Sequence, residues 1–373
     1  MSATIEPEGK PKRRAALWKR LAPWAITLVC FGYLYTRIGG AAQRNDPPLS
    51  VPAYLAGIFA SVDWVHWLAL MIPYSFLYLL IDTTVLWRVV NWFNTKVSFL
   101  DLLPVRASTY IISIVNEQVG KGAIAVYLHR RDGVPGWQIG SSMIFIMFCE
   151  FYYLLFWAVE GVALRGDQLP EIFHWIPRIA VVAVIFFAAF VYYFRSPRFA
   201  SSTLRERPIF LSFRKAPPWY YLIIIAIRSP ALLGAAWVYS EVAALFGVDL
   251  SFVDMLGYLP VIFFGTLVPG PFRAVAVTMW PLLVPDHAGE MAVFGLVQHN
   301  FFVLFNAAIG LLFLRRVSRE LFGTPAEIQA QIRRLCWEMG QGGGYILAPA
   351  KSLQPETSIE NAIAVIEAFT HQE

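Results

Sequence analysis

The stretch LVPGPFR, residues 267 to 273, interrupts an apolar segment that runs from about residue 252 to residue 284. Proline lacks the backbone N–H that a helix uses and glycine readily adopts turn conformations, so Pro-Gly-Pro ends one helix and starts another. Arg273 adds a charge that a lipid-facing helix disfavours. We therefore expect two short helices joined by a turn, and the segments around them decide where that turn lies.

The composition indicates which solvent the chain occupies. Hydrophobic residues make up 57% and aromatic residues 16% of the 373 residues, and the mean hydropathy is +0.55. A soluble domain of this length cannot bury so much apolar surface, so we expect an integral membrane protein. The net charge of +5 does not indicate a nucleic-acid partner, because the arginines form short clusters between apolar spans.

Cysteine usage gives no sign of a metal site or a disulfide framework. Cys30, Cys149 and Cys336 lie in unrelated segments, with no Cys-x-x-Cys pair and no spacing typical of metal ligands. We treat them as small apolar residues and expect no metal and no cofactor.

Six apolar runs are long enough to cross a bilayer as helices. They cover residues 21 to 37, 64 to 93, 137 to 164, 174 to 195, 218 to 247 and 290 to 314. The first run follows the basic residues 1 to 20 and lacks a small-residue cleavage site. We expect it to be a retained anchor with a cytoplasmic amino end.

Two further apolar stretches, residues 98 to 129 and 252 to 284, are broken midway by NEQVGKG (116 to 122) and PGPFR (269 to 273). If each crossed the membrane once, the arginine-rich loop 195 to 215 would lie outside, against the positive-inside bias. If each enters and leaves on one face, this loop and both termini are cytoplasmic. We therefore expect two re-entrant hairpins, whose irregular tips line protein or water.

An internal repeat relates the two hairpins. SFLDLL at residue 98 and SFVDML at residue 251 lie 153 positions apart, and each begins with a serine that can cap a helix. The shared order of crossing, hairpin and crossing defines repeat one as residues 64 to 165 and repeat two as residues 218 to 316. The repeats start on opposite faces in this topology, which is typical of secondary transporters with a site at the bilayer midplane.

Charged and polar residues fall near the middle of several crossings: Asp82, Glu150, Arg228 and the pair His299 and Asn300. Charge at this depth is unfavourable and is therefore usually paired, functional, or both. Glu150 and Asn300 are equivalent in the repeat, which favours a shared substrate cavity. The alternative is a salt bridge of Arg228 to Asp82 or Glu150 that only holds helices together.

The hairpin tips offer a second set of candidate substrate-binding residues. After Gly270 the second arm would point free N–H groups into the membrane beside Arg273, which is an arrangement that binds anions. The first tip has Asn116 and Lys121 in the corresponding place. The alternative is that the glycines and prolines only make the turns and that the cations reach the headgroups.

LPVIFFGTLVPGPFR (259 to 273) is similar to the second of two glycine-rich broken-helix motifs in the membrane-domain family named for lysylphosphatidylglycerol synthase. In that family an acidic or basic position follows in the next helix, where Glu150 and Asn300 stand here. The resemblance covers residues 20 to 316. It implies movement of a charged-headgroup lipid between leaflets.

Residues 317 to 373 are expected to form a small cytoplasmic α/β tail. From residue 323 they resemble the last helix, strand and helix of the uroporphyrinogen decarboxylase family barrel. Thr324 with Glu327 and Thr357 with Glu360 have the spacing of helix starts, and GGYILAP (343 to 349) is typical of a buried strand. One strand cannot close an eight-stranded barrel, so we expect no decarboxylase activity.

The predicted fold class is thus an all-α polytopic membrane protein with six transmembrane helices, two re-entrant hairpins in an inverted repeat, and this tail. The leading function is a transporter or flippase of an anionic or zwitterionic lipid in a bacterial cytoplasmic membrane, not an enzyme. The first alternative is a membrane enzyme that uses Glu150 or His299 on a lipid-linked substrate, although no HExxH, nucleophile elbow or P-loop is found. The second is a non-transporting assembly partner.

Overall fold

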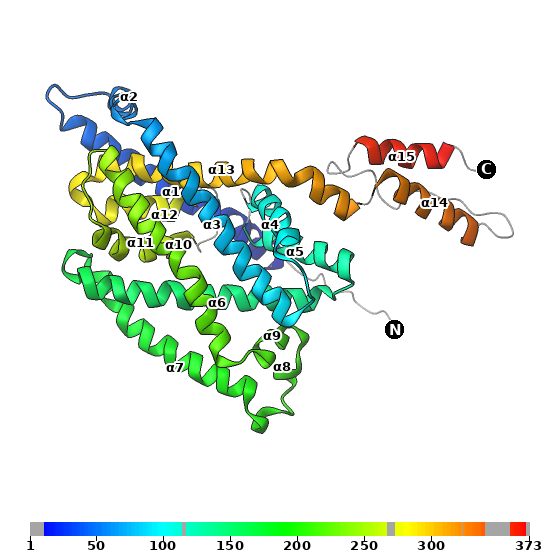
Figure 1. The fold of residues 1–373 in the computed structure, drawn as a ribbon. Coiled ribbons are helices and arrows are strands. Elements are labelled where there is room, and N and C mark those ends of the chain that lie inside the picture. Colours follow the sequence, from blue (N-terminus) through cyan, green and yellow to red (C-terminus); the bar gives the residue numbers. More distant parts are fainter. Residues whose placement is uncertain (1–10, 114–116, 267–272, 323, 340–358, 371–373) are drawn as a thin grey trace, which may run out of the picture.

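The computed structural model describes residues 11 to 113, 117 to 266, 273 to 322, 324 to 339 and 359 to 370, and this part of the chain contains helices and no strand (Figure 1). The long helices are α1 (Pro11–Gln43), α3 (Trp64–Phe93), α6 (Gly136–Arg165), α7 (Ile176–Arg195), α10 (Pro218–Leu245) and α13 (Ala288–Phe322). The shorter α-helices are α2 (Val51–Ser61), α4 (Phe99–Ser113), α5 (Glu117–Asp132), α8 (Thr203–Glu206), α9 (Leu211–Lys215), α11 (Phe252–Thr266), α12 (Ala274–Leu283), α14 (Pro325–Met339) and α15 (Ile359–Thr370). Single 3₁₀ turns cover Gly166–Gln168, Glu171–Trp175, Pro197–Phe199, Pro208–Phe210 and Pro285–His287.

Six of the described helices are long and apolar enough to cross a membrane. Their apolar spans are Trp24–Gln43, Trp64–Phe93, Gly136–Arg165, Phe173–Arg195, Pro218–Leu245 and Pro285–Phe313. These bounds agree with the six runs expected from the sequence to within a few residues at most ends. The expectation of an all-α membrane protein is therefore confirmed at this level.

Side-chain caps explain why several helices begin where they do. The Asp63 carboxylate accepts hydrogen bonds from the first backbone N–H groups of α3, at 3.0 Å from Val65 and from His66. Ser251 and Asp254 cap α11 reciprocally, as their spacing predicted. These bonds satisfy N–H groups that have no partner inside the helix.

Two pairs of short helices form hairpins. The end of α5 returns to the start of α4, because Arg131 Nη2 lies 2.9 Å from Asp101 Oδ2. In the second pair, a Cβ added to Gly265 of α11 would lie 3.0 Å from the backbone of Ala276 in α12, so the two arms touch near their tip. Helices of 15 and 10 residues rise only about 22 and 15 Å, so neither arm of this pair spans a 30 Å hydrocarbon core alone.

The long helices α3 and α10 pack antiparallel along their whole length. Trp64 contacts Phe246, Tyr74 contacts Tyr239, and Trp92 stacks on Tyr220, with ring centroids 6.3, 5.7 and 3.8 Å apart. Residue numbers rise along one helix as they fall along the other. These two helices therefore run in opposite directions, side by side.

The first arm of each hairpin packs on a long helix that lies outside that hairpin. α4 lies along α13, and α11 lies along α6. Both crossings are close: a Cβ on Gly310 would lie 2.4 Å from the Ala107 carbonyl, and one on Gly161 would lie 2.7 Å from the Gly257 carbonyl. Glycine permits these contacts because it brings no side chain between the backbones.

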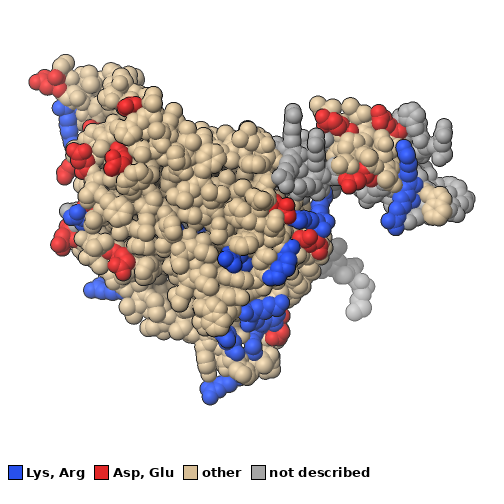
Figure 2. Space-filling model, viewed as in Figure 1, with Lys and Arg blue, Asp and Glu red and all other residues tan. Residues whose placement is uncertain are grey.

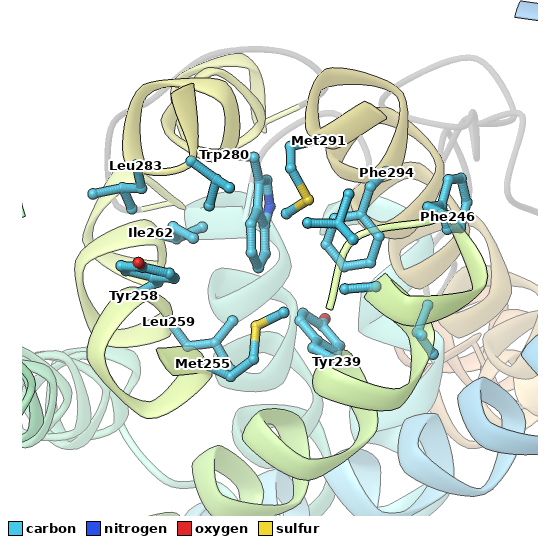
Figure 3. Packing of buried hydrophobic residues seen from close by; sticks show 14 of the residues in the cluster. Tyr239, Phe246, Met255, Tyr258, Leu259, Ile262, Trp280, Leu283, Met291 and Phe294 are labelled. Atoms are coloured by element: carbon cyan, nitrogen blue, oxygen red, sulfur yellow. The ribbon is translucent and has the colours of Figure 1, made fainter. Parts of the chain in front are cut away.

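The apolar core fills the space between these helices. Figure 3 shows Trp280 of α12 pointing between Met291 and Phe294 of α13 on one side and Ile262 of α11 on the other. Trp280, Met291, Phe294 and Ile262 are all fully buried. This packing fixes α12 against α13, and so fixes the position of the residue that precedes α12.

Charged side chains gather near two opposite ends of the helical body, and the band between them is mostly uncharged on the face in Figure 2. α14 and α15 pack on each other beyond the end of α13 (Figure 1). The predicted cap is present, since Thr324 N donates to Glu327 Oε2 at 2.7 Å. The strand expected at residues 343 to 349 lies outside the described residues.

Candidate functional site

A cavity of about 70 Å³ lies among the long helices. Helices α3, α6, α10, α11 and α13 and the start of α12 supply its walls, and the volume is enough for roughly five water molecules or a small polar group. Its lining residues are Tyr74, Tyr78, Ile81, Asp82, Glu150, Tyr153, Leu154, Arg228, Ala231, Leu232, Tyr239, Phe263, Thr266, Arg273, His299 and Phe302. The structure thus brings together five of the residues predicted from the sequence: Asp82, Glu150, Arg228, Arg273 and His299.

Arg228 of α10 bridges two carboxylates from the first repeat. Its Nη2 lies 3.5 Å from Asp82 Oδ1 and its Nη1 lies 3.3 Å from Glu150 Oε1. Only 7% of Asp82 and 6% of Arg228 are exposed, and Glu150 stands at the centre of α6. The predicted pairing of Arg228 with Asp82 or Glu150 is therefore confirmed, and it involves both carboxylates.

Arg106 of α4 completes this network and was missed in the sequence analysis. Its Nε lies 2.5 Å from Asp82 Oδ2, and Tyr110 donates a hydrogen bond to the same oxygen at 2.9 Å. The guanidinium also lies over the Tyr110 ring, 4.8 Å from its centroid. A signal was present, because Arg106 is an isolated charge inside the apolar stretch 98 to 115.

Arg273 precedes α12 in a left-handed backbone conformation, with φ 49° and ψ 37°. Its guanidinium lies 5.8 Å from the centroid of the Phe302 ring. Among the described residues no carboxylate lies within ion-pair distance of Arg273. The predicted position at the start of a half-helix is present, although Gly270 and the rest of the tip lie outside the described residues.

His299 and Asn300 are adjacent in sequence but lie on different sides of α13. His299 is 3% exposed and its Nε2 accepts a hydrogen bond from Trp280 Nε1 at 3.2 Å. Asn300 donates to the Leu296 carbonyl of its own helix at 2.7 Å and does not line the cavity. Successive helix residues are about 100° apart, so only one of the two can face the cavity.

The two residues predicted at the tip of the first hairpin are Asn116 and Lys121. Lys121 belongs to α5, but its side chain is not described, and Asn116 lies outside the described residues. Neither residue is therefore placed at the cavity or away from it.

The described charges around the cavity do not cancel. Arg106, Arg228 and Arg273 carry three positive charges, whereas Asp82 and Glu150 carry two negative charges, so the difference is one positive charge. Charges interact strongly where water is largely excluded. Within the described ranges no group of three His, Cys, Asp or Glu side chains is placed to hold a metal ion. The arrangement favours a small anionic group.

Comparison of the chain with protein-family models, curated proteins and solved structures finds no match.

Proposed function

We propose that the protein moves a lipid with a charged headgroup from one membrane leaflet to the other. The observation that carries this proposal is the buried ion network, to which both repeats contribute. Asp82, Arg106 and Glu150 come from the first repeat and Arg228 from the second. Arg273, also from the second, lines the same cavity without an ion pair to a described carboxylate. A charged side chain at the centre of a membrane helix costs about 2.5 to 3.5 kcal/mol in insertion experiments. A network of this size is typical of a substrate path.

The arrangement of the helices supports an inverted repeat. α3 and α10 are equivalent in the repeat and pack antiparallel. α4 on α13 and α11 on α6 are equivalent pairs, and each pair crosses at a glycine of its long helix, Gly310 or Gly161. Rocking of two such halves about a shared site is how many transporters alternate access.

The hairpins support re-entrant segments. Both arms of the first hairpin end at the same level, where Asp101 meets Arg131. On the proposed topology this level is the cytoplasmic face, as are both termini, and the membrane is a bacterial cytoplasmic membrane. The sequence resemblance to the lysylphosphatidylglycerol synthase membrane-domain family implies the same class of function.

Reconstitution into liposomes tests the proposal. Fluorescent anionic, zwitterionic and neutral lipids are placed in one leaflet, and their appearance in the other leaflet is followed with time. We expect faster transfer of a charged-headgroup lipid than in protein-free liposomes, with no change in its mass. A new lipid product would instead identify a membrane enzyme, and neither transfer nor product would favour an assembly partner.

A matched pair of variants on α6 ties transfer to the cavity. Glu150→Gln removes a carboxylate that partly neutralises Arg228, so we expect an anionic headgroup to leave more slowly and the transfer rate to fall. Glu160→Gln makes the same change at an exposed position of the same helix and should keep the wild-type rate. Equal transfer rates for the two variants would show that lipid transfer does not depend on this cavity.

A further inference from the structure

A side recess lies next to the cavity, between α3, α4, α13 and the start of α12. Its lining residues are Tyr78, Arg106, Tyr110, Arg273, Phe302, Val303 and Asn306. Tyr78, Arg273 and Phe302 also line the main cavity, so the two spaces are adjacent. The recess therefore brings Arg106 and Arg273 to one space, one from each repeat.

Polar groups in this recess have unused hydrogen-bonding capacity. Arg106 uses Nε toward Asp82 and Nη1 toward Thr109, and its Nη2 has no partner among the described residues. Arg273 makes no hydrogen bond to any described residue. Asn306 is 3% exposed, and its Oδ1 is buried without a partner in the described part of the chain. Arg273 is partly exposed, and of these groups only Asn306 Oδ1 is fully buried without a partner in the described part of the chain. Buried polar groups in native proteins are nearly always paired, so this atom points to a ligand in the recess.

The three groups suit an oxyanion. Two guanidinium groups present N–H donors in planar forks, which match phosphate oxygens. Rotation of the Asn306 side-chain amide by half a turn exchanges the positions of its oxygen and its nitrogen. In that orientation the amide N–H group is a third donor. Asp82 already accepts hydrogen bonds from Arg106 and Tyr110, and it keeps these bonds when the anion is bound.

The charge balance narrows the class of anion. Arg106 and Arg228 balance Asp82 and Glu150, so Arg273 leaves the described side chains with an excess of one positive charge, which a monovalent anion neutralises. A phosphodiester carries one negative charge at all physiological pH values, whereas a phosphomonoester carries about 1.5 to 2 negative charges at pH 7. We propose that the recess binds the phosphodiester of a phospholipid between Arg106 and Arg273, with Asn306 as a third donor. This assignment rests on the proposed function and names the chemical group that the site holds.

The backbone at Arg273 supports this role independently. Its φ of 49° lies in the left-handed region, and it is the only non-glycine residue with positive φ in the described part of the chain. Residues other than glycine disfavour this conformation, because their Cβ atom lies too close to the backbone. Strained residues of this kind cluster at ligand sites, and here the strain directs a guanidinium into the recess.

A carboxylate introduced at Asn306 tests the assignment. Asn306→Asp keeps the side-chain shape and supplies the missing negative charge from the protein itself. We expect affinity for short-chain phosphatidylglycerol, measured by calorimetry in detergent, to fall by roughly 10- to 100-fold, the scale of one or two charge-assisted contacts. The thermal unfolding midpoint should stay level or rise, because the new charge neutralises the arginines.

Asn300→Asp is the matched control, because it makes the same substitution on α13 at a position that does not line the recess. It should bind within about threefold of wild type, since an uninvolved side chain changes affinity by under 1 kcal/mol. Equal affinities of Asn306→Asp and wild type would overturn the assignment.

A probe series separates the sources of the anion. We expect short-chain phosphatidylglycerol to bind most tightly, the corresponding phosphatidic acid and inorganic phosphate more weakly, and diacylglycerol weakest of all. Tighter binding of inorganic phosphate or phosphatidic acid than of phosphatidylglycerol would overturn the phosphodiester assignment. If binding follows the expected order but no lipid crosses in liposomes, the transport function fails and the assignment stands. If charged-headgroup lipids cross in liposomes but Asn306→Asp binds phosphatidylglycerol as tightly as wild type, the transport function stands and the assignment fails.

Discussion

Arg273 places an arginine side chain where the backbone conformation suits glycine. Arg273→Gly should relieve this strain and remove the guanidinium, so we expect stability to be kept while anion affinity falls. Arg273→Ala should lose the same affinity but unfold more easily than the glycine variant, by about 1 kcal/mol, because alanine keeps the strain. Denaturant titration in detergent, paired with the calorimetric binding assay, measures both effects. Wild-type affinity in Arg273→Gly would show that Arg273 takes no part in binding.

Asp82 holds two buried arginines, and its removal should destabilise the fold. Asp82→Ala leaves Arg106 and Arg228 without their shared carboxylate, and breaking a buried ion pair in this way costs about 3 to 5 kcal/mol. Asp286→Ala at an exposed position is the control and should stay within about 0.5 kcal/mol of wild type. Denaturant titration in detergent gives both values. A loss below about 1 kcal/mol for Asp82→Ala would mean that water reaches the network and screens its charges.

Some residues of the candidate site could be identified from the sequence, and others could not. Asp82, Glu150 and Arg228 stand out because charge is rare inside apolar spans. The orientation of Asn300 could not be predicted, because a helix that is apolar on most sides has no stripe that marks its buried face. Arg106 could have been found, but only the fold shows that it meets Asp82 from another helix.

Among the helices, the crossing of α4 and α13 depends on the absence of a side chain at Gly310. Gly310→Ala would place a Cβ 2.4 Å from the Ala107 carbonyl, so the helices must separate. We expect a loss of about 1 to 3 kcal/mol, the usual range for overpacking. Gly32→Ala in α1 is the control, because nothing lies within 4 Å of its added Cβ and alanine favours helix. Equal thermal midpoints for the two variants would contradict the close crossing.

The extents of the helices were more predictable than their contacts. Length and hydropathy located all six spans, and the Ser-x-x-Asp pattern located the start of α11. The helix α2 was not predicted, because its 11 residues fall below the length of a crossing. The pairing of Asp101 with Arg131 joins residues from two arms of a hairpin, which helix periodicity alone does not reveal.

For the whole molecule, the proposed topology makes a prediction about accessibility. After the native cysteines are replaced, single cysteines at Arg131 and Ser201 should react only with reagents on the cytoplasmic side, and a cysteine at Asp286 only with reagents outside. The basic loop 195 to 215 is the reason, since such loops stay cytoplasmic. A membrane-impermeant maleimide applied to intact cells and to inverted vesicles measures this. Labelling at position 201 from outside would rule out the two re-entrant hairpins.

The helix α7 has an unusual place in this molecule, because only 6% of the apolar span that contains it is buried. It packs mainly on α6 and α9 and adds no residue to the cavity or its side recess. On the proposed topology each repeat begins and ends on the same face, so a duplicated copy joined directly to the first would begin on that face and be inserted in the same orientation. The one extra crossing takes the chain to the opposite face, where the second copy begins in the inverted orientation. If an ancestral unit was duplicated, α7 therefore sets the orientation in which the second copy is inserted during synthesis. Selection on this helix would act on its length and hydrophobicity rather than on the identity of its side chains.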